Sequence, residues 1–149
     1  MRDQFTVPDL AGTVIGHRCW GLAKTPTGIL LVSWGNTLWP PSQPLTATCN
    51  HKSHDAPGND CSCGIYALTP GEGFPYYSYD GPHLPVWGEV HLWGEIIRGT
   101  KGYRAQHGYP KSLHLAHKDW KAAEPLEQAY GIKVQLANPY TKGITDGHW

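Results

Sequence analysis

The sequence has little charge and no excess of either sign. Charged residues account for 16% of its 149 residues, and 12 lysines and arginines balance 12 aspartates and glutamates. A chain without a net positive field has no general attraction for phosphate backbones or anionic lipid. The composition therefore argues against non-specific nucleic-acid binding, although nine histidines would add positive charge under mildly acidic conditions.

Long apolar runs are also missing. The first residues, Met1 to Phe5, contain no run that resembles a signal peptide, and no later stretch approaches the length of a membrane span. We therefore expect a cytoplasmic protein. In that reducing compartment, clustered cysteines bind metal more often than they form disulfides.

Glycine, proline and aromatic residues, by contrast, are abundant. The chain has 18 Gly, 13 Pro, 7 Trp and 8 Tyr. Gly and Pro disfavour helices and mark turns, whereas aromatic side chains favour pleated sheets. These features predict an α+β fold that is mostly antiparallel β. We expect a small curved sheet or a partly open barrel, with one C-terminal helix and a zinc-knuckle-like loop.

The length and the apolar pattern predict one domain over residues 1–149. The continuous apolar run at 29–34 is the expected central strand, and the alternating stretch at 86–97 is the expected long strand of a hairpin. One helix is expected within 114–130, with a break at Pro125 and an end at Gly131. Further strands are expected at 13–20, 45–49, 63–68, 103–106 and 132–136, with an arm at 1–12, an aromatic Gly/Pro-rich loop at 69–85 and a tail at 138–149.

A cluster of cysteine and histidine residues is the strongest motif. Its spacing is Cys-x4-His-x6-Cys-x-Cys, and zinc binds such thiolate and imidazole donors tetrahedrally, with four protein ligands at structural sites. We therefore predict a structural zinc ion; His51 and Cys19 are alternative ligands, and ordinary buried cysteines are the other interpretation. The predicted ligands are Cys49, His54, Cys61 and Cys63.

Two catalytic interpretations of the same residues are weaker. A catalytic zinc would keep one position for water and would need a nearby carboxylate. The chain has neither the His-Glu-x-x-His motif nor the paired His-x-Glu and Pro-Cys-x-x-Cys motifs of zinc deaminases. Cys19 shares a strand face with His17 and could be a nucleophile, but a buried, apolar-like cysteine is the favoured interpretation.

Aromatic and polar residues around the 86–106 hairpin form a candidate ligand site. Aromatic walls with a few convergent polar groups suit a planar ligand such as a nucleotide or a sugar. The alternatives are that the tryptophans are core residues and that a Glu–Arg pair only holds the sheet register. The candidate residues are Trp87, Glu89, His91, Trp93, Tyr103 and Arg104, with Tyr77 and Tyr79 as a lid or a protein-contact patch.

Several strings resemble a family of small proteins from actinobacteria and their phages. They are Arg18-Cys19-Trp20, the Cys/His cluster continuing into Cys63-Gly64-Ile65-Tyr66-Ala67, Val86-x-Gly88-x-Val90-x-Leu92-Trp93-Gly94, Gly102-Tyr103-Arg104-Ala105, and Tyr130-Gly131-Ile132-Lys133-Val134. The family has no established activity, so the resemblance implies no catalytic residue. It implies a cytoplasmic, phage-borne protein that shares the Cys/His cluster and interacts with a host component.

The expected function is that of a non-catalytic, zinc-stabilised binding protein for a nucleotide-like ligand or a host protein. One alternative is a small metal- or cysteine-dependent enzyme acting on a nucleotide-like substrate. Another is a nucleic-acid-binding protein, which would need its cations on one face. Those cations are Lys24, Arg98, Lys101, Arg104 and Lys111.

Overall fold

The computed structural model describes residues 13–33, 37–49, 54–70 and 85–137. The predicted arm and tail, and most of the 69–85 loop, lie outside the described residues. Within these ranges no helix has both the length and the apolar character needed to cross a membrane. The elements are β1 (Val14–Thr25), β2 (Gly28–Ser33), β3 (Thr37–Leu38), β4 (Leu45–Thr46), β5 (Ile65–Leu68), β6 (Val86–Arg98), β7 (Gly102–Pro110), β8 (Leu113–Ala116), the 3₁₀ helix η3 (His117–Ala122), α1 (Ala123–Tyr130) and β9 (Val134–Ala137).

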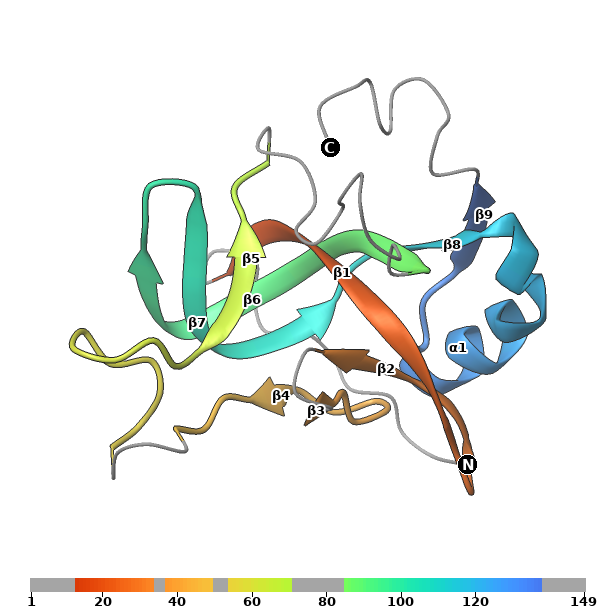
Figure 1. The fold of residues 1–149 in the computed structure, drawn as a ribbon, viewed down its shortest axis with the longest axis horizontal. Coiled ribbons are helices and arrows are strands. Elements are labelled where there is room, and N and C mark those ends of the chain that lie inside the picture. The colour runs from red at the N-terminus through yellow and green to blue at the C-terminus, as the bar shows by residue number, and fades with distance from the viewer. Residues whose placement is uncertain (1–12, 34–36, 50–53, 71–84, 138–149) are drawn as a thin grey trace.

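Four antiparallel strands close into a small barrel. β1 pairs with β6, β6 with β7, and β7 with β5. The ring closes where β5 returns to β1, at the single residue pair His17 and Leu68. β2, β3, β4, β8 and β9 extend this barrel as outer strands, and α1 packs at one end (Figure 1). The predicted class, α+β and mostly antiparallel β with one C-terminal helix, is confirmed.

The β6–β7 hairpin forms the predicted long alternating pair. Val86, Val90 and Leu92 are fully buried, as their period of two requires. The register shifts between Trp93 and Ile96, which is a β-bulge, and Gly94 lies within it at φ 80°. A left-handed conformation of this kind favours glycine. The bulge therefore explains why Gly94 stands in the strand, which the alternating pattern alone does not explain.

Two sequence-based assignments were wrong. The apolar run at 29–34 was expected to be a central strand, but β2 lies between β3 and β1, near the edge of the sheet. Its outer position arises because β1 continues beyond Trp20 to Thr25 and turns there into a hairpin with β2. Only Leu31 of β2 is completely buried, against the helix side of the core.

The C-terminal helix is shorter than expected. Residues 113–116 form β8 instead, which pairs with β6, and a 3₁₀ turn then leads into α1. Pro125 lies in the first turn of α1, where no backbone N–H is needed, so it does not break the helix. Gly131 ends the helix at φ 71°, as predicted.

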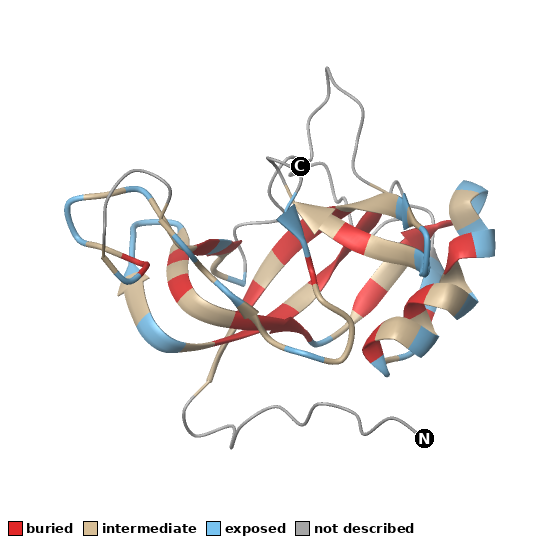
Figure 2. Cartoon of the chain, turned by 90° about the horizontal axis from the view of Figure 1, so that it is seen from below, coloured by how far each residue is buried: buried red, intermediate tan, exposed pale blue. Residues whose placement is uncertain are grey.

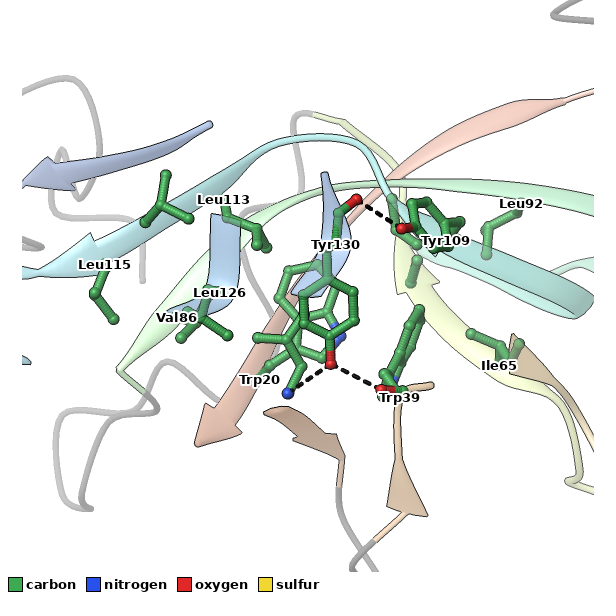
Figure 3. Close-up of a cluster of buried hydrophobic side chains, with 14 of the residues drawn as sticks. Trp20, Trp39, Ile65, Val86, Leu92, Tyr109, Leu113, Leu115, Leu126 and Tyr130 are labelled. Atoms are coloured by element: carbon green, nitrogen blue, oxygen red, sulfur yellow. Dashed lines mark hydrogen bonds between the residues drawn. The ribbon is translucent and has the colours of Figure 1, made fainter. Parts of the chain in front are cut away.

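Buried tyrosine hydroxyls fasten the helix to the sheets. The Tyr130 hydroxyl accepts a hydrogen bond from the Leu31 N–H at 2.8 Å and donates one to the Trp39 carbonyl at 2.7 Å (Figure 3). The Tyr109 hydroxyl donates to the Tyr130 carbonyl at 2.6 Å. Trp39 also meets Trp20 edge to face, with ring centroids 5.6 Å apart. Buried residues accordingly run along the inner strands and one side of α1 (Figure 2).

Candidate metal centre

The four predicted ligands lie together. The sulfur atoms of Cys49, Cys61 and Cys63 and a ring nitrogen of His54 are all within 4.8 Å of one another. The Cys49 and Cys61 sulfurs are 3.5 Å apart, and the Cys63 sulfur is 3.8 Å from His54 Nε2. Metal–ligand bonds of about 2.0–2.3 Å in a tetrahedron separate the donors by roughly 3.5–3.8 Å. The cluster can therefore hold a metal ion.

The cluster lies on a loop between β4 and β5, two short strands that pair one after the other along β7. Thr46 in β4 pairs with His107, the Ala47 N–H donates to the Gln106 carbonyl at 2.8 Å, and Ile65 in β5 pairs with Ala105. The partners on β7 are consecutive, so the chain leaves the sheet at 48 and returns to the adjacent position at 65. We call residues 48–64 the metal loop. Its ends are fixed by the sheet, and all four candidate ligands lie on it.

The His54 ring is oriented by its own neighbourhood. Its Nδ1 lies 2.6 Å from the Asp55 carbonyl. A carbonyl only accepts hydrogen bonds, so Nδ1 carries the proton and Nε2 presents its lone pair to the sulfurs, as is usual for a metal-bound histidine. The Asp55 carbonyl also raises the pKa of His54, against the effect of partial burial. A Cβ at Gly58 would lie 2.5 Å from His54 Cε1, so the ring packs directly on that glycine.

The thiols have unequal acidities. The backbone N–H of Cys63 donates to the Cys61 sulfur, and this bond, followed by the contact with Cys49, lowers the pKa of Cys61. Burial instead raises the pKa of Cys63. Because a metal binds thiolates, the lowered pKa of Cys61 favours the form of this thiol that binds an ion. All four cysteines of the chain are free thiols.

The side chain of Arg104, on β7, binds the backbone of the metal loop. Its Nη1 donates to the carbonyls of Cys61 at 2.6 Å, Cys63 at 2.8 Å and Gly58 at 3.2 Å. The sequence interpretation made Arg104 a ligand-binding residue or a partner of a glutamate. Glu89 instead pairs with Lys111 at 3.3 Å. The role of Arg104 depends on loop carbonyls, whose directions no sequence pattern reveals.

Of the two alternative ligands, Cys19 does not belong to the group of donors that the described structure brings together. Cys19 is 1% exposed on β1, and burial raises its pKa to about 12, although the charge of Arg18 acts in the opposite direction. A thiol of that acidity is protonated at neutral pH, which is the reverse of an activated nucleophile. His51 lies outside the described residues.

Four of the predicted ligand-binding side chains lie within or beside the barrel. Trp87 is 2% exposed and stacks on His114 at 5.9 Å, whereas Trp93 lies against His107 at 5.7 Å. His91 is buried, and its pKa is lowered by that burial and by the charge of Lys111. The fourth of these side chains, Glu89, forms an ion pair with Lys111. Tyr77 and Tyr79 lie outside the described residues.

The other two predicted residues, Tyr103 and Arg104, line a shared cavity of about 370 Å³. This cavity lies where β5 meets the β6–β7 turn, directly beside the metal loop. We call it the hairpin cavity. Its lining is mainly apolar and consists of Tyr66, Ala67, Leu68, Ile97, Gly99, Lys101, Gly102, Tyr103 and Arg104.

Arg18 is a buried cation that sequence reasoning did not select as a site residue. It is 5% exposed, and its guanidinium lies 5.0 Å from the ring centre of Trp39 and 5.6 Å from that of Trp20. It donates to the Tyr66 carbonyl at 2.6 Å and to Ser33 Oγ at 2.9 Å. The sequence feature that could have pointed to Arg18 is its position directly before Cys19 and Trp20, two residues of types that are often buried.

Comparison with known proteins adds no assignment. No family model, no curated protein and no solved structure matches the chain. The resemblance to actinobacterial and phage proteins stays a prediction.

Proposed function

We propose that the chain is a non-catalytic, cytoplasmic binding protein whose metal loop is held by a structural zinc ion. The observation that carries the proposal is a set of four protein donors whose ligand atoms all lie within 4.8 Å of one another, Cys49, His54, Cys61 and Cys63. Four donors fill the shell of a zinc ion and leave no position for water or substrate. Thiolates and imidazole are donors that zinc prefers, and free thiols are the state that a reducing compartment maintains.

The ion has a physical task in this fold. Along the described part of the metal loop, few side chains are buried, the exceptions being Ala56 and Pro57. Ordering such a segment costs conformational entropy that apolar burial alone does not offset. A zinc ion and the three hydrogen bonds from Arg104 would supply the missing free energy and set the loop beside the hairpin cavity.

The test is metal analysis of the purified full-length chain. We expect about one zinc per chain, and we expect a chelator to lower the melting temperature by several degrees because zinc binding is coupled to ordering of the loop. Cys61→Ser should lose the zinc, whereas Cys19→Ala should retain it. A metal-free protein whose melting temperature does not change on adding zinc would refute the structural-zinc proposal.

A further inference from the structure

The hairpin cavity has the size and lining of a small-molecule site. At about 370 Å³ it falls within the ordinary range for ligand pockets. Leu68 and Ile97 supply apolar side chains, and Gly99 and Gly102 add no side chain to fill the space. Apolar walls with few polar groups are typical of sites that bind small molecules.

Tyr66 offers an aromatic face to this cavity. Its side chain is 45% exposed although it stands on an inner strand of the barrel. The hydroxyl donates to the Ser62 carbonyl in the metal loop, and the main-chain carbonyl accepts from Arg18. The hydroxyl bond therefore fixes the ring in an exposed position, the Arg18 bond fixes the backbone that carries it, and a preformed stacking surface loses little entropy when a ligand binds.

The charge of the cavity is positive. Among the described residues that line it, the charged ones are Lys101 and Arg104, and none is acidic. Arg104 already holds the metal loop, so Lys101, which is exposed, is the lining cation left for a ligand. The backbone of Lys101 is fixed, because its carbonyl accepts from the Thr69 N–H and hydroxyl, each at 2.9 Å. An anionic group is the complement of this side chain.

We propose that the hairpin cavity binds one nucleotide unit, with its base against the Tyr66 ring and its phosphate at Lys101. Stacking of a base on an exposed tyrosine is tolerant of base identity, and a lysine at the rim meets a phosphate as a point charge. The unit is either a free mononucleotide or one residue of a single strand. This inference rests on the proposed binding function and names its ligand class.

The positions of the cations on the β6–β7 hairpin favour binding of a single nucleotide unit over binding of a long nucleic-acid strand. Arg98 and Lys101 lie at the β6–β7 turn, but Lys111 lies at the far end of β7 and is paired with Glu89. Strands rise about 3.3 Å per residue, so the length of β7 separates the two groups of cations by more than 20 Å. Arg98 and Lys101 thus form a local positive site that does not continue along β7 to Lys111 as a track for a phosphate backbone.

The experiment is calorimetric titration of the zinc-loaded full chain with adenosine monophosphate, with adenosine, and with a short oligodeoxyadenylate. We expect saturable 1:1 binding of the nucleotide and binding about 3- to 10-fold weaker for adenosine, which lacks the phosphate. Tighter binding of the oligonucleotide than of the mononucleotide would assign the unit to a strand. The opposite order would assign it to a free nucleotide.

Three variants locate the binding. Lys101→Gln should weaken nucleotide binding about 3- to 10-fold and reduce its salt dependence. Tyr66→Leu should weaken it by about tenfold or more, whereas Tyr66→Phe keeps the ring and should retain most of the affinity. The matched control is Lys118→Gln, an exposed lysine on η3 outside the cavity lining, which should bind as the parent chain does.

The outcomes separate this inference from the zinc proposal because zinc content is measured on the same samples. One zinc per chain, with no saturable binding of either phosphate-bearing ligand up to about 1 mM, overturns the nucleotide site and leaves the metal centre standing. Binding that Lys101→Gln and Tyr66→Leu leave unchanged also overturns the site. Variant-sensitive binding in a chain that contains no zinc would instead overturn the metal proposal alone.

Discussion

At the scale of single residues, Arg104 joins two features of the molecule, since it lines the hairpin cavity and holds three carbonyls of the metal loop. Arg104→Met keeps the length of the side chain but removes all three hydrogen bonds. We expect zinc affinity to fall about 10- to 100-fold, because outer partners of a metal site fix the geometry of its ligands. Competition with a chromogenic chelator measures this affinity.

The matched control is Arg98→Met. Arg98 is an exposed arginine on the same hairpin, and its guanidinium lies 5.4 Å from the Tyr103 ring centre. It makes no described contact with the metal loop, so zinc affinity should stay within about twofold of the parent chain. Equal zinc affinities of the two variants would contradict a supporting role for Arg104.

Cys19 predicts a loss of stability at alkaline pH. Burial raises its pKa to about 12 in the folded protein, against an ordinary value near 9.0. The unfolded chain therefore releases this proton above pH 9 while the folded chain keeps it. The Cys19 thiol thus leaves the free energy of unfolding unchanged below pH 9 and lowers it as the pH rises towards 12. Urea unfolding should show a decrease of about 1.4 kcal/mol between pH 8 and pH 10 from this group.

Cys19→Ala isolates that contribution. The substitution lowers stability by a constant amount through the lost packing, but it should flatten the slope of stability against pH between 8 and 10. The other three thiols are common to both proteins and cancel in the comparison. Parallel slopes would contradict the buried, protonated state of Cys19.

At the residue scale, the sequence identified the four candidate metal ligands that the structure brings together, but not the residues that support them. Cys49, His54, Cys61 and Cys63 were predictable because ligand type and spacing are properties of the chain itself. Arg104 and Arg18 could not be assigned, since each acts on carbonyls or rings that tertiary folding brings to it. Trp87 and His91, assigned to a ligand site, are buried on the face of β6 opposite to the core residues Val86, Val90 and Leu92, and an alternating strand pattern does not reveal that both faces are covered.

At the scale of elements, the metal loop depends on Gly58 for the placement of its histidine. A Cβ there would lie 2.5 Å from His54 Cε1, so Gly58→Ala should push the imidazole away from the three sulfurs. We expect weaker zinc binding, by about tenfold, with little change in the stability of the β6–β7 hairpin. Hydrogen exchange would show faster amide exchange within 54–64 and unchanged exchange in β6 and β7.

Gly99→Ala is the control for this substitution. Gly99 stands in the β6–β7 turn, and the nearest atom to an added Cβ is 3.6 Å away, which is an ordinary contact. This variant should keep the zinc affinity of the parent chain. If both variants lost zinc to the same extent, the steric account of His54 would fail.

Element prediction succeeded where local pattern and pairing agree. The β6–β7 hairpin, the short strands on either side of the metal loop, and the end of α1 at Gly131 follow from alternation, spacing and a C-cap glycine. The start of the helix was misplaced because residues 113–116 satisfy a helical pattern as well as a strand pattern. Pairing with β6 and β9 decides between them, and that pairing is non-local.

At the scale of the whole molecule, closure of the barrel depends on a narrow contact between β1 and β5. A Cβ at Gly16 would lie 2.6 Å from the Ala67 Cβ and 3.3 Å from the Leu68 carbonyl oxygen. Gly16→Val should force these strands apart and reduce the free energy of unfolding by about 2–4 kcal/mol. Urea denaturation, with hydrogen exchange at β1 and β5, measures the effect.

Ala23→Val provides the comparison. Ala23 lies on the same strand, but beyond the barrel, where β1 pairs with β2 opposite Leu30. It is only partly buried, and valine suits a strand, so stability should change by no more than about 0.5 kcal/mol. A loss as large as that of Gly16→Val would show that closure of the barrel is not the sensitive step.

The hydroxyl of Tyr130 has a consequence for how the chain folds as it is made. Its partners, Leu31 and Trp39, lie 99 and 91 residues earlier in the sequence. A ribosome adds roughly 5–20 residues per second, so these N-terminal segments wait roughly 5–20 s for the residue that fastens them. During that interval the apolar strand β2 lacks its cover, and newly synthesised chains should depend on chaperones more than the finished protein does.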